Sequence, residues 1–326
     1  MPEIGYRTVG RRAAILGLGG HVPDQRVSNA MLSEHLDTSD EWIRQRTGIA
    51  ERRMAVTGAS TSELALPAAR QALERAEVLA SELDLIVLGT SSPDRPFPAA
   101  ACVLQRQLGA DRAMAFDVLA ACSSWLYAAS VAERYIATGS VRRALVVGSE
   151  VLSRLLDYTD RGTCILFGDG AGAAVLGPSD DAGFDSWVIG ADGRQSELIY
   201  CSPDEEDGLP RLRMDGRETF KSATRVMEEA ALRACAIAEV APGELALVVP
   251  HQANRRIVEA VARRLGIGLD RFSLNLDRYG NTSSASIPLA LEEASSAGRL
   301  QPGDRVLLVG FGSGLTWGAT VMTWGA

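Results

Sequence analysis

The chain has 326 residues, of which 46% are hydrophobic and 23% are charged, so it can bury one large core or two joined cores. Its net charge of -8 argues against nucleic acid as the main partner, and no run of about 18 uncharged apolar residues is present that would cross a membrane. The five cysteines are odd in number, widely spaced and without metal-ligand spacing, so we expect free thiols, a reducing cytoplasm and no metal site.

The first predicted elements are a strand and a helix. Residues 13–20 form an apolar run, AAILGLGG, that predicts a first strand. Ser60 begins a helix with a capping-box pattern, because Glu63 follows three residues later. Apolar residues then recur at helical spacing up to position 76, which predicts a helix packed on a core.

From residue 83 onward, strands and helices alternate, and they do so twice. The order strand, helix, strand, helix, strand occupies residues 83–150 and returns over residues 245–314. This alternation predicts two α/β halves, each with a mostly parallel sheet and right-handed crossovers. We divide the chain into an N-terminal half, residues 1–177, and a C-terminal half, residues 178–326. The predicted strands of the two repeats cover residues 83–90, 113–120, 143–150, 245–250, 271–276 and 307–311.

Two glycine-rich segments require separate interpretation. Residues 167–177, FGDGAGAAVLG, lack the GKS/T ending of a phosphate-binding loop and lead into a strand, so their glycines predict close backbone packing. Residues 310–318, GFGSGLTWG, lie between the last two predicted strands. Such a turn can direct backbone N–H groups into a pocket, although a plain hairpin would need the same residues.

Cys122 lies at the junction of an apolar strand and a predicted helix over residues 123–137. The thiol would therefore sit near the positive end of a helix dipole and near unpaired N–H groups, both of which favour a thiolate. Cysteine is also a common small core residue. The position alone leaves both roles open.

His251 and Asn281 each follow a predicted strand, at the point where α/β folds collect their chemistry. Taken alone, His251 fits a buried histidine bonded to a carbonyl, and Asn281 fits a helix cap. When the two halves are aligned, however, Cys122 and Asn281 occupy nearly equivalent places. A twofold pairing of the halves would bring these helix starts together, which predicts a Cys, His, Asn site.

Six motifs in order resemble the β-ketoacyl-acyl carrier protein synthase III family of the thiolase superfamily, from about residue 14 to the C-terminus. The resemblance implies a five-layered αβαβα thiolase-like fold with two pseudo-twofold-related halves, and a cytoplasmic homodimer. The motifs are DTSDEWIRQRTGI (37–49), AAC ending at Cys122, DRGTCILFGDGAGAAVLG (160–177), HQAN (251–254), YGNTSSASIPLAL (279–291) and FGSGLTWG (311–318).

The resemblance also implies a reaction. An acyl-CoA primer, acetyl or another short acyl, acylates Cys122, and malonyl-acyl carrier protein then loses carbon dioxide and attacks the thioester to give 3-oxoacyl-acyl carrier protein, which initiates fatty-acid synthesis. His251 and Asn281 would donate hydrogen bonds to the enolate, and the backbone N–H groups of Cys122 and Ser313 would bind the oxyanion. The CoA thioester is a substrate, and no cofactor is expected.

Further site residues follow from the same resemblance. The side chains of Trp42 and Arg161 match positions that sandwich the adenine of CoA, and Arg46 matches one that meets its phosphates. Trp42 could instead be a packing residue on a helix, and arginine pairs such as those near Arg256 could instead be ordinary solvent-exposed surface residues. The acyl-pocket matches are Phe97, which would reach across the dimer, Trp125 and Phe167, and the carrier-protein docking matches are Lys221 and Arg256.

Three departures from the family pattern leave the preferred primer open. Ser123, Ser124 and Trp125 stand where many relatives have a small pair and an aromatic residue, and Ser313 stands where they have glycine or alanine. The segment 191–210 is shorter than usual. Two alternatives to the fatty-acid assignment remain: a starter-unit enzyme of a polyketide pathway, and a non-catalytic dimeric scaffold.

Overall fold

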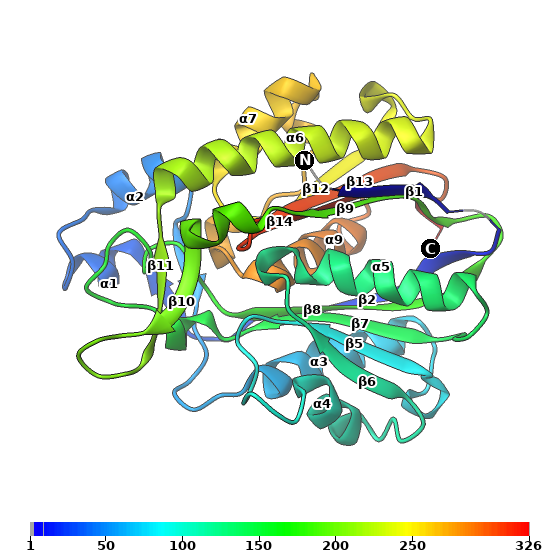
Figure 1. The fold of residues 1–326 in the computed structure, drawn as a ribbon, viewed down its shortest axis with the longest axis horizontal. Coiled ribbons are helices and arrows are strands. Elements are labelled where there is room, and N and C mark those ends of the chain that lie inside the picture. The colour runs from blue at the N-terminus through cyan, green and yellow to red at the C-terminus, as the bar shows by residue number, and fades with distance from the viewer. Residues whose placement is uncertain (1–2, 9, 326) are drawn as a thin grey trace.

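Two five-stranded sheets organise the fold in the computed structural model, which describes residues 3–8 and 10–325 (Figure 1). In the first sheet the order is β2 (Arg12–His21), β8 (Gly170–Ser179), β7 (Ala144–Glu150), β5 (Leu85–Gly89), β6 (Met114–Val118). In the second it is β1 (Glu3–Arg7), β9 (Gly183–Ala191), β14 (Thr316–Thr323), β13 (Arg305–Gly312), β12 (Leu247–Pro250).

Helices form three layers around these sheets, so the predicted five-layered αβαβα fold is confirmed (Figure 1). One outer layer, on the first sheet, contains α3 (Thr61–Arg75) and α4 (Ala100–Leu108). The inner layer contains α5 (Ser124–Ala137) and α9 (Ser286–Ser296), and the other outer layer contains α6 (Gly216–Ala238) and α7 (Arg255–Leu265). No described helix is long and apolar enough to span a bilayer.

Helix α3 shows how local sequence sets this packing. Ser60 caps it, and the reciprocal bond from Glu63 completes the predicted capping box. Its buried face lies directly on β2, where a Cβ on Gly19 would come within 2.0 Å of the Ala68 carbonyl oxygen. Glycine is therefore required at this contact between helix and strand.

The prediction of mostly parallel sheets is wrong. In the first sheet β5 pairs in parallel with both β6 and β7, but β8 is antiparallel to both β2 and β7. In the second sheet only β12 and β13 are parallel. The short turn from β13 to β14 reverses the chain and makes these two strands antiparallel neighbours. The boundary placed after residue 177 falls inside β8, and β1 joins the second sheet by pairing with β9.

Residues 271–276 do not form the predicted strand. A single bridge joins Phe272 to Val248, and the Ser273 N–H donates to the Val248 carbonyl at 2.9 Å. Pro250 has no N–H to continue the ladder. The Gln252 side chain replaces the missing backbone donor, because the Gln252 amide nitrogen donates to the Ser273 carbonyl at 3.1 Å.

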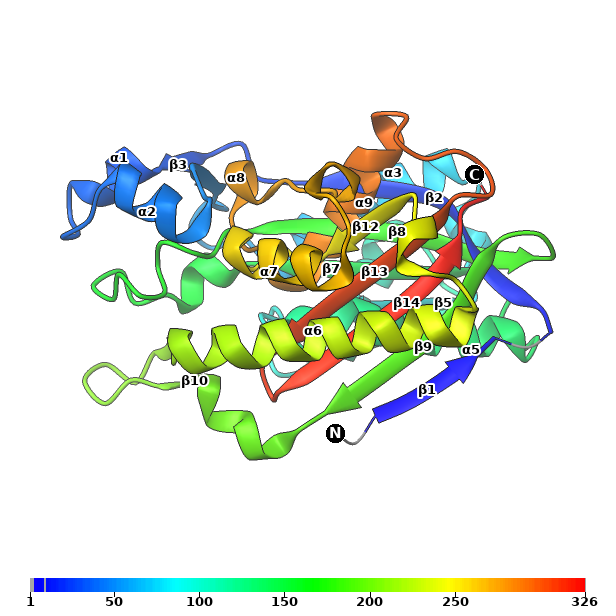
Figure 2. The ribbon, with the colours of Figure 1, turned by 90° about the horizontal axis from the view of Figure 1, so that it is seen from above.

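Smaller elements gather at one end of the sheets, where Figure 2 shows α1, α2 and α8 together. They include α1 (Asn29–Ser33), α2 (Asp40–Thr47), α8 (Leu276–Tyr279), the pair β3 (Arg26–Ser28) and β4 (Glu51–Arg53), and the hairpin of β10 (Ile199–Pro203) and β11 (Pro210–Met214). The 3-10 helices are η1 (Ala80–Glu82), η2 (Ala121–Ser123), η3 (Leu152–Leu155), η4 (Gly193–Leu198), η5 (Pro242–Glu244), η6 (Leu269–Arg271) and η7 (Ser283–Ala285).

Candidate active site

Two turns of the same shape begin the inner helices α5 and α9. Ala121 in η2 and Ser283 in η7 both have a φ of 49°, a left-handed conformation that is uncommon for residues other than glycine. Each is followed by two further residues of its 3-10 turn and then by the helix. The backbone counterpart of Cys122 is therefore Ser284, and Asn281 lies three residues before it.

Side-chain hydroxyls hold the turn that presents Cys122. The Ala120 carbonyl accepts from Ser123 Oγ at 2.7 Å and from Thr316 Oγ1 at 2.8 Å, while the Ala120 N–H donates to Ser124 Oγ at 2.8 Å. The serine pair that departs from the family pattern thus satisfies polar groups in a strained turn, which costs roughly 1–3 kcal/mol to maintain.

The turn between β13 and β14 lies against the Cys122 backbone. A Cβ on Gly312 would stand 2.6 Å from the Ala120 carbonyl oxygen and 2.8 Å from the Cys122 nitrogen, so only glycine allows this approach. Ser313 follows directly, and its added hydroxyl donates to the Ile199 carbonyl. The glycine-rich turn therefore both closes a hairpin and borders the site.

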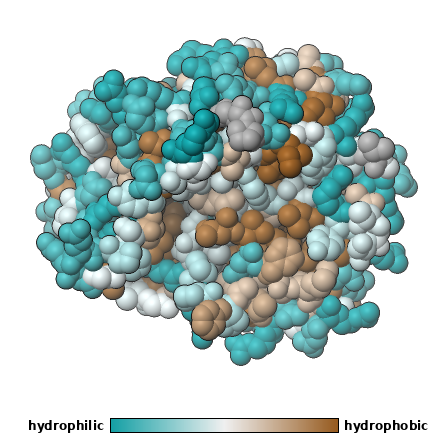
Figure 3. Space-filling model, in the orientation of Figure 1, coloured by the Kyte–Doolittle hydropathy of each residue, from teal (hydrophilic) through white to brown (hydrophobic). Residues whose placement is uncertain are grey.

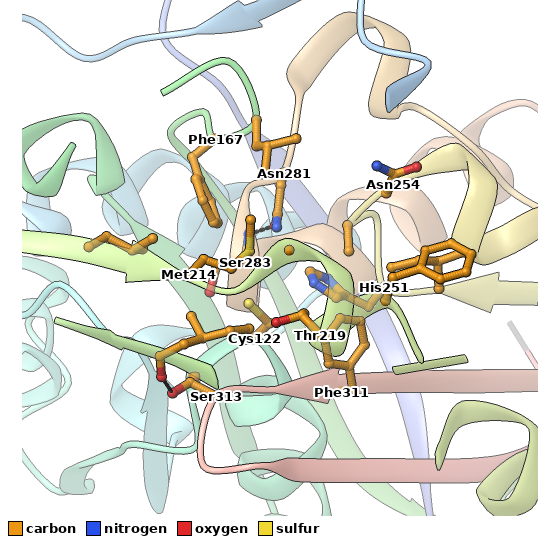
Figure 4. A pocket seen from close by; sticks show the side chains of 18 of the residues that line it. Cys122, Phe167, Met214, Thr219, His251, Asn254, Asn281, Ser283, Phe311 and Ser313 are labelled. Carbon is orange, nitrogen blue, oxygen red and sulfur yellow. Dashed lines mark hydrogen bonds between the residues drawn. The ribbon is translucent and has the colours of Figure 1, made fainter. Parts of the chain in front are cut away.

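His251 is held from both sides and directed into the cavity (Figure 4). The backbone N–H of His251 donates to the Val309 carbonyl at 2.8 Å, and its ring Nδ1 lies 2.7 Å from Ser286 Oγ. The other ring nitrogen, Nε2, is buried and has no partner among the described residues. Burial lowers the pKa of His251 to about 3, so the imidazole is neutral at ordinary pH.

Asn281 is positioned by the glycine-rich segment after residue 167. Its N–H donates to the Leu166 carbonyl at 2.8 Å, and its own carbonyl accepts from Gly168 at 3.0 Å. A Cβ on Gly168 would stand 2.3 Å from the Tyr279 carbonyl oxygen, which confirms that this glycine permits close packing. The Asn281 Oδ1 accepts from the Ser283 N–H at 2.8 Å, which leaves the amide NH₂ as the free hydrogen-bonding end.

One cavity of about 1180 Å³ brings Cys122, His251 and Asn281 together (Figure 4). Apolar side chains from η3, β10, β11 and α7 form much of its wall. The other predicted site residues that line it are Trp42, Arg46, Arg161, Phe167, Lys221, Arg256 and Ser313.

Trp42 lies at the cavity with two arginines beside it. The guanidinium carbons of Arg46 and Arg161 stand 5.0 and 5.3 Å from its ring. Arg161 also donates to the Asp37 carboxylate at 3.2 Å. These distances lie in the range of cation–π contacts, so the three predicted CoA-binding side chains form one cluster.

The cavity is cationic although the chain is acidic. The described residues that line it include no aspartate or glutamate. The lining cations are Arg46, Arg161, Arg217, Lys221 and Arg256. A local field of this sign attracts anionic ligands even when the net charge is -8.

Two predicted acyl-pocket residues lie outside this cavity. Trp125 is fully buried in the core between the sheets, because α5 turns it toward that core, so the single chain does not place it in the pocket. Phe97 precedes α4 on a loop and is 82% exposed. Phe167 alone of the three lines the cavity.

A buried carboxylate beside the site escaped the sequence analysis. Glu150 ends β7 with no exposed surface, and its carboxylate accepts from Ser283 Oγ at 3.0 Å. Ser283 lines the cavity together with Cys122, and its hydroxyl acts to lower the pKa of that thiol. Burial outweighs this effect and raises the pKa of Cys122 to about 12, so the helix start alone does not determine its reactivity. The one sequence signal was an acidic residue closing an otherwise apolar strand.

Comparisons with known proteins match this architecture. Residues 116–193 match the family model described as 3-Oxoacyl-[acyl-carrier-protein (ACP)] synthase III, and residues 235–324 match the model of its C-terminal part. A Beta-ketoacyl-[acyl-carrier-protein] synthase III from Roseiflexus sp. (strain RS-1) is 49% identical over 96% of this chain and 99% of its own length.

Solved structures are similar over nearly the whole chain. The 3-oxoacyl-[acyl-carrier-protein] synthase III from Aquifex aeolicus VF5 is 43% identical with a TM-score of 0.92, covering 96% of this chain and 100% of its own. The priming beta-ketosynthase from the R1128 polyketide biosynthetic pathway is 37% identical with a TM-score of 0.93, covering 97% and 98%.

Proposed function

The chain belongs to the 3-oxoacyl-[acyl-carrier-protein] synthase III family, and we propose on that premise that it condenses an acyl-CoA primer with malonyl-acyl carrier protein. The primer is acetyl or another short acyl group, and the 3-oxoacyl product initiates fatty-acid synthesis. The observation that carries the proposal is the cavity that joins Cys122, His251 and Asn281 to the cationic cluster around Trp42.

In the first half-reaction, the Cys122 sulfur attacks the thioester carbonyl of the primer. The tetrahedral oxyanion receives hydrogen bonds from the backbone N–H groups of Cys122 and Ser313. The close approach of Gly312 to the Cys122 nitrogen supports this pairing. The C–S bond to CoA then breaks, and CoA leaves as a thiol with the proton that Cys122 lost.

In the second half-reaction, malonyl-acyl carrier protein loses carbon dioxide and its electron pair moves onto the thioester as an enolate. His251 Nε2–H and the Asn281 amide donate to the enolate oxygen. A histidine with a pKa of about 3 donates as the neutral imidazole, and in the tautomer in which the Ser286 hydroxyl donates to Nδ1 the proton is on Nε2. The carbanion attacks the acyl-Cys122 carbonyl, and the thiolate returns. This electron balance needs no added cofactor.

The cluster at Trp42 fits the nucleotide of CoA. Aromatic stacking on an adenine needs contacts of about 3.5–4 Å on each face, so a sandwich requires roughly 7–8 Å between Trp42 and Arg161. Their present separation of 5.3 Å means that Arg161 moves outward on binding and releases Asp37. Arg46 then remains near the phosphates as their charge partner.

The carrier protein docks where Lys221 and Arg256 border the cavity. Lys221 is half exposed and pairs only with Glu218, a neighbour on its own helix, among the ion pairs of the described residues. Arg256 lies 5.8 Å from the Phe220 ring, on the facing helix. Exposed pairs of this kind are weak, so both cations are available to an acidic partner.

A homodimer forms through the face shown in Figure 3, where hydrophobic side chains gather. Both sheets end on this face, one at β1 and the other at β6, so it offers two unpaired strand edges. Leu119, directly after β6, is 76% exposed, and Phe97, on the loop before α4, is 82% exposed. A second copy of the chain would cover them, and size-exclusion chromatography with light scattering tests this.

The test of the function is intact-mass spectrometry after incubation with several acyl-CoAs, followed by addition of malonyl-acyl carrier protein. An acyl adduct on Cys122 that disappears as 3-oxoacyl product forms supports the proposal. An inert chain would indicate the scaffold role. The likeness to a polyketide priming enzyme supports a second candidate, a starter-unit synthase, and the primer panel separates the two. The free cysteines fit a cytoplasmic setting.

A further inference from the structure

Glu150 is a buried carboxylate that the two half-reactions above leave without a role. It has no exposed surface and lies at the end of β7, below the Cys122 turn. Burial of a charge is costly unless donors compensate it. Four groups do so: Thr90 Oγ1 at 3.1 Å, the Ser91 N–H at 3.0 Å, Ser92 Oγ at 2.6 Å and Ser283 Oγ at 3.0 Å.

The direction of these bonds identifies the state of the carboxylate. Ser92 Oγ accepts from the Val151 N–H at 2.9 Å, and Thr90 Oγ1 accepts from the Ser92 N–H at 3.0 Å. Each hydroxyl therefore points its own proton at Glu150. With a backbone N–H as the third donor, Glu150 fits as an ionised acceptor although burial raises its pKa.

Ser283 is the link between this carboxylate and the nucleophile. Its hydroxyl donates to Glu150 Oε1 at 3.0 Å, which leaves its oxygen lone pairs free, and it lines the same cavity as Cys122, whose thiol pKa it acts to lower. Its N–H donates to Asn281 Oδ1, and its φ of 49° fixes the side-chain direction. His251 is a poor alternative base, because burial holds its pKa at about 3.

We propose that Ser283 and Glu150 form a proton relay that activates Cys122 for acylation. As the Cys122 Sγ–H bond breaks and the sulfur attacks the primer, Ser283 Oγ takes the thiol proton and passes its own to Glu150. When the C–S bond to CoA breaks, the proton returns through Ser283 to the departing CoA sulfur. Glu150 acts through Ser283 and is a positioning residue that stores the proton; the relay rests on the proposed role of Cys122.

The relay and a purely electrostatic role of Glu150 predict opposite effects. The negative charge of Glu150 raises the pKa of Cys122, so its removal alone would make the thiol more reactive. Loss of the proton acceptor would instead slow acylation. Glu150 is faced by the Thr90 and Ser92 hydroxyls and the Ser91 N–H from the loop after β5, and by the Ser283 hydroxyl from η7. The titratable group that interacts with it is Cys122 of η2.

The experiment measures single-turnover acylation by acetyl-CoA, by intact mass, across pH. We expect Ser283→Ala and Glu150→Gln to slow acylation at least about tenfold at neutral pH and to make its rate rise with hydroxide, while Ser283→Thr restores most of the rate. Glu133→Gln is the matched control, since Glu133 is equally buried, on α5, and bonds Thr8 and Arg134 instead.

Faster or unchanged acylation in Glu150→Gln overturns the relay, as does equal slowing in Glu133→Gln. Should Ser283→Ala not fold, Glu150→Gln against Glu133→Gln still decides the matter, because each replaces one buried carboxylate by an amide of the same shape. The premise is tested separately: acyl label in Cys122→Ala would refute the nucleophile itself. Loss of label there, with normal kinetics in both relay variants, would refute only the relay.

Discussion

The buried, neutral state of His251 makes protein stability depend on pH in a way that a single substitution should reveal. Its pKa falls from 6.5 when unfolded to about 3 when folded. The unfolded state therefore binds more protons between these values, so stability is present above pH 6.5 and is lost as the pH falls toward 3. The linkage relation gives a loss of about 2 kcal/mol between pH 7 and pH 5 from this one group.

The assay is urea denaturation of the wild type and of His251→Gln at pH 7 and pH 5, at one protein concentration. The buried acids, such as Glu150 and Asp169, titrate in both proteins, and so does His21; their contributions cancel in the comparison. We expect the pH-dependent loss to be about 2 kcal/mol smaller in His251→Gln. Equal losses in both proteins would show that His251 titrates normally and would remove the basis for a neutral imidazole donor.

The remaining predictions concern catalysis. Asn281→Ala should slow malonyl decarboxylation by about 100- to 1000-fold and affect acylation less, measured as separate half-reactions, and equal losses would contradict the enolate role. Trp42→Ala should raise the KM for acyl-CoA more than for an acyl-pantetheine without the nucleotide; equal effects would make Trp42 a packing residue. Lys221→Glu and Arg256→Glu should weaken condensation with malonyl-acyl carrier protein and leave acylation by acyl-pantetheine unchanged. The difference in condensation rate between variant and wild type should become smaller as salt is raised, because salt screens the charges. An unaffected carrier-protein step would move the docking site elsewhere.

The sequence identified the catalytic candidates because each follows an apolar run, a pattern that depends only on local periodicity. Cys122 and His251 do follow strands, β6 and β12, whereas the run before Asn281 forms no strand. Trp125 was assigned to the pocket from the family resemblance, and in this chain α5 buries its side chain in the core. Glu150 was missed because its donors come from the loop after β5 and from η7, which the sequence separates widely.

The fold was predictable in its layers and less so in its sheets. The spacing of apolar residues predicted the helices, and the residues Ser60 and Glu63 predicted the capping box that begins α3. Pairing direction depends on turns and on single residues that end a ladder. Pro250 and Gln252 end the hydrogen-bond ladder beside β12. Strand β1 pairs with β9 in the second sheet, a contact between distant residues that local sequence patterns do not predict.

The repeated turn explains how one fold supports two half-reactions at one point. Ala121 and Ser283 share a left-handed conformation, so η2 and η7 present equivalent backbone to the centre of the molecule. In the first half, the residue after the left-handed one is Cys122, the proposed nucleophile. In the second, its counterpart Ser284 donates to the Gly89 carbonyl at 2.9 Å, and Asn281, the proposed enolate donor, lies three residues before it. The two halves are thus alike in backbone at these turns, and the different side chains that they carry there give them different proposed roles at one site.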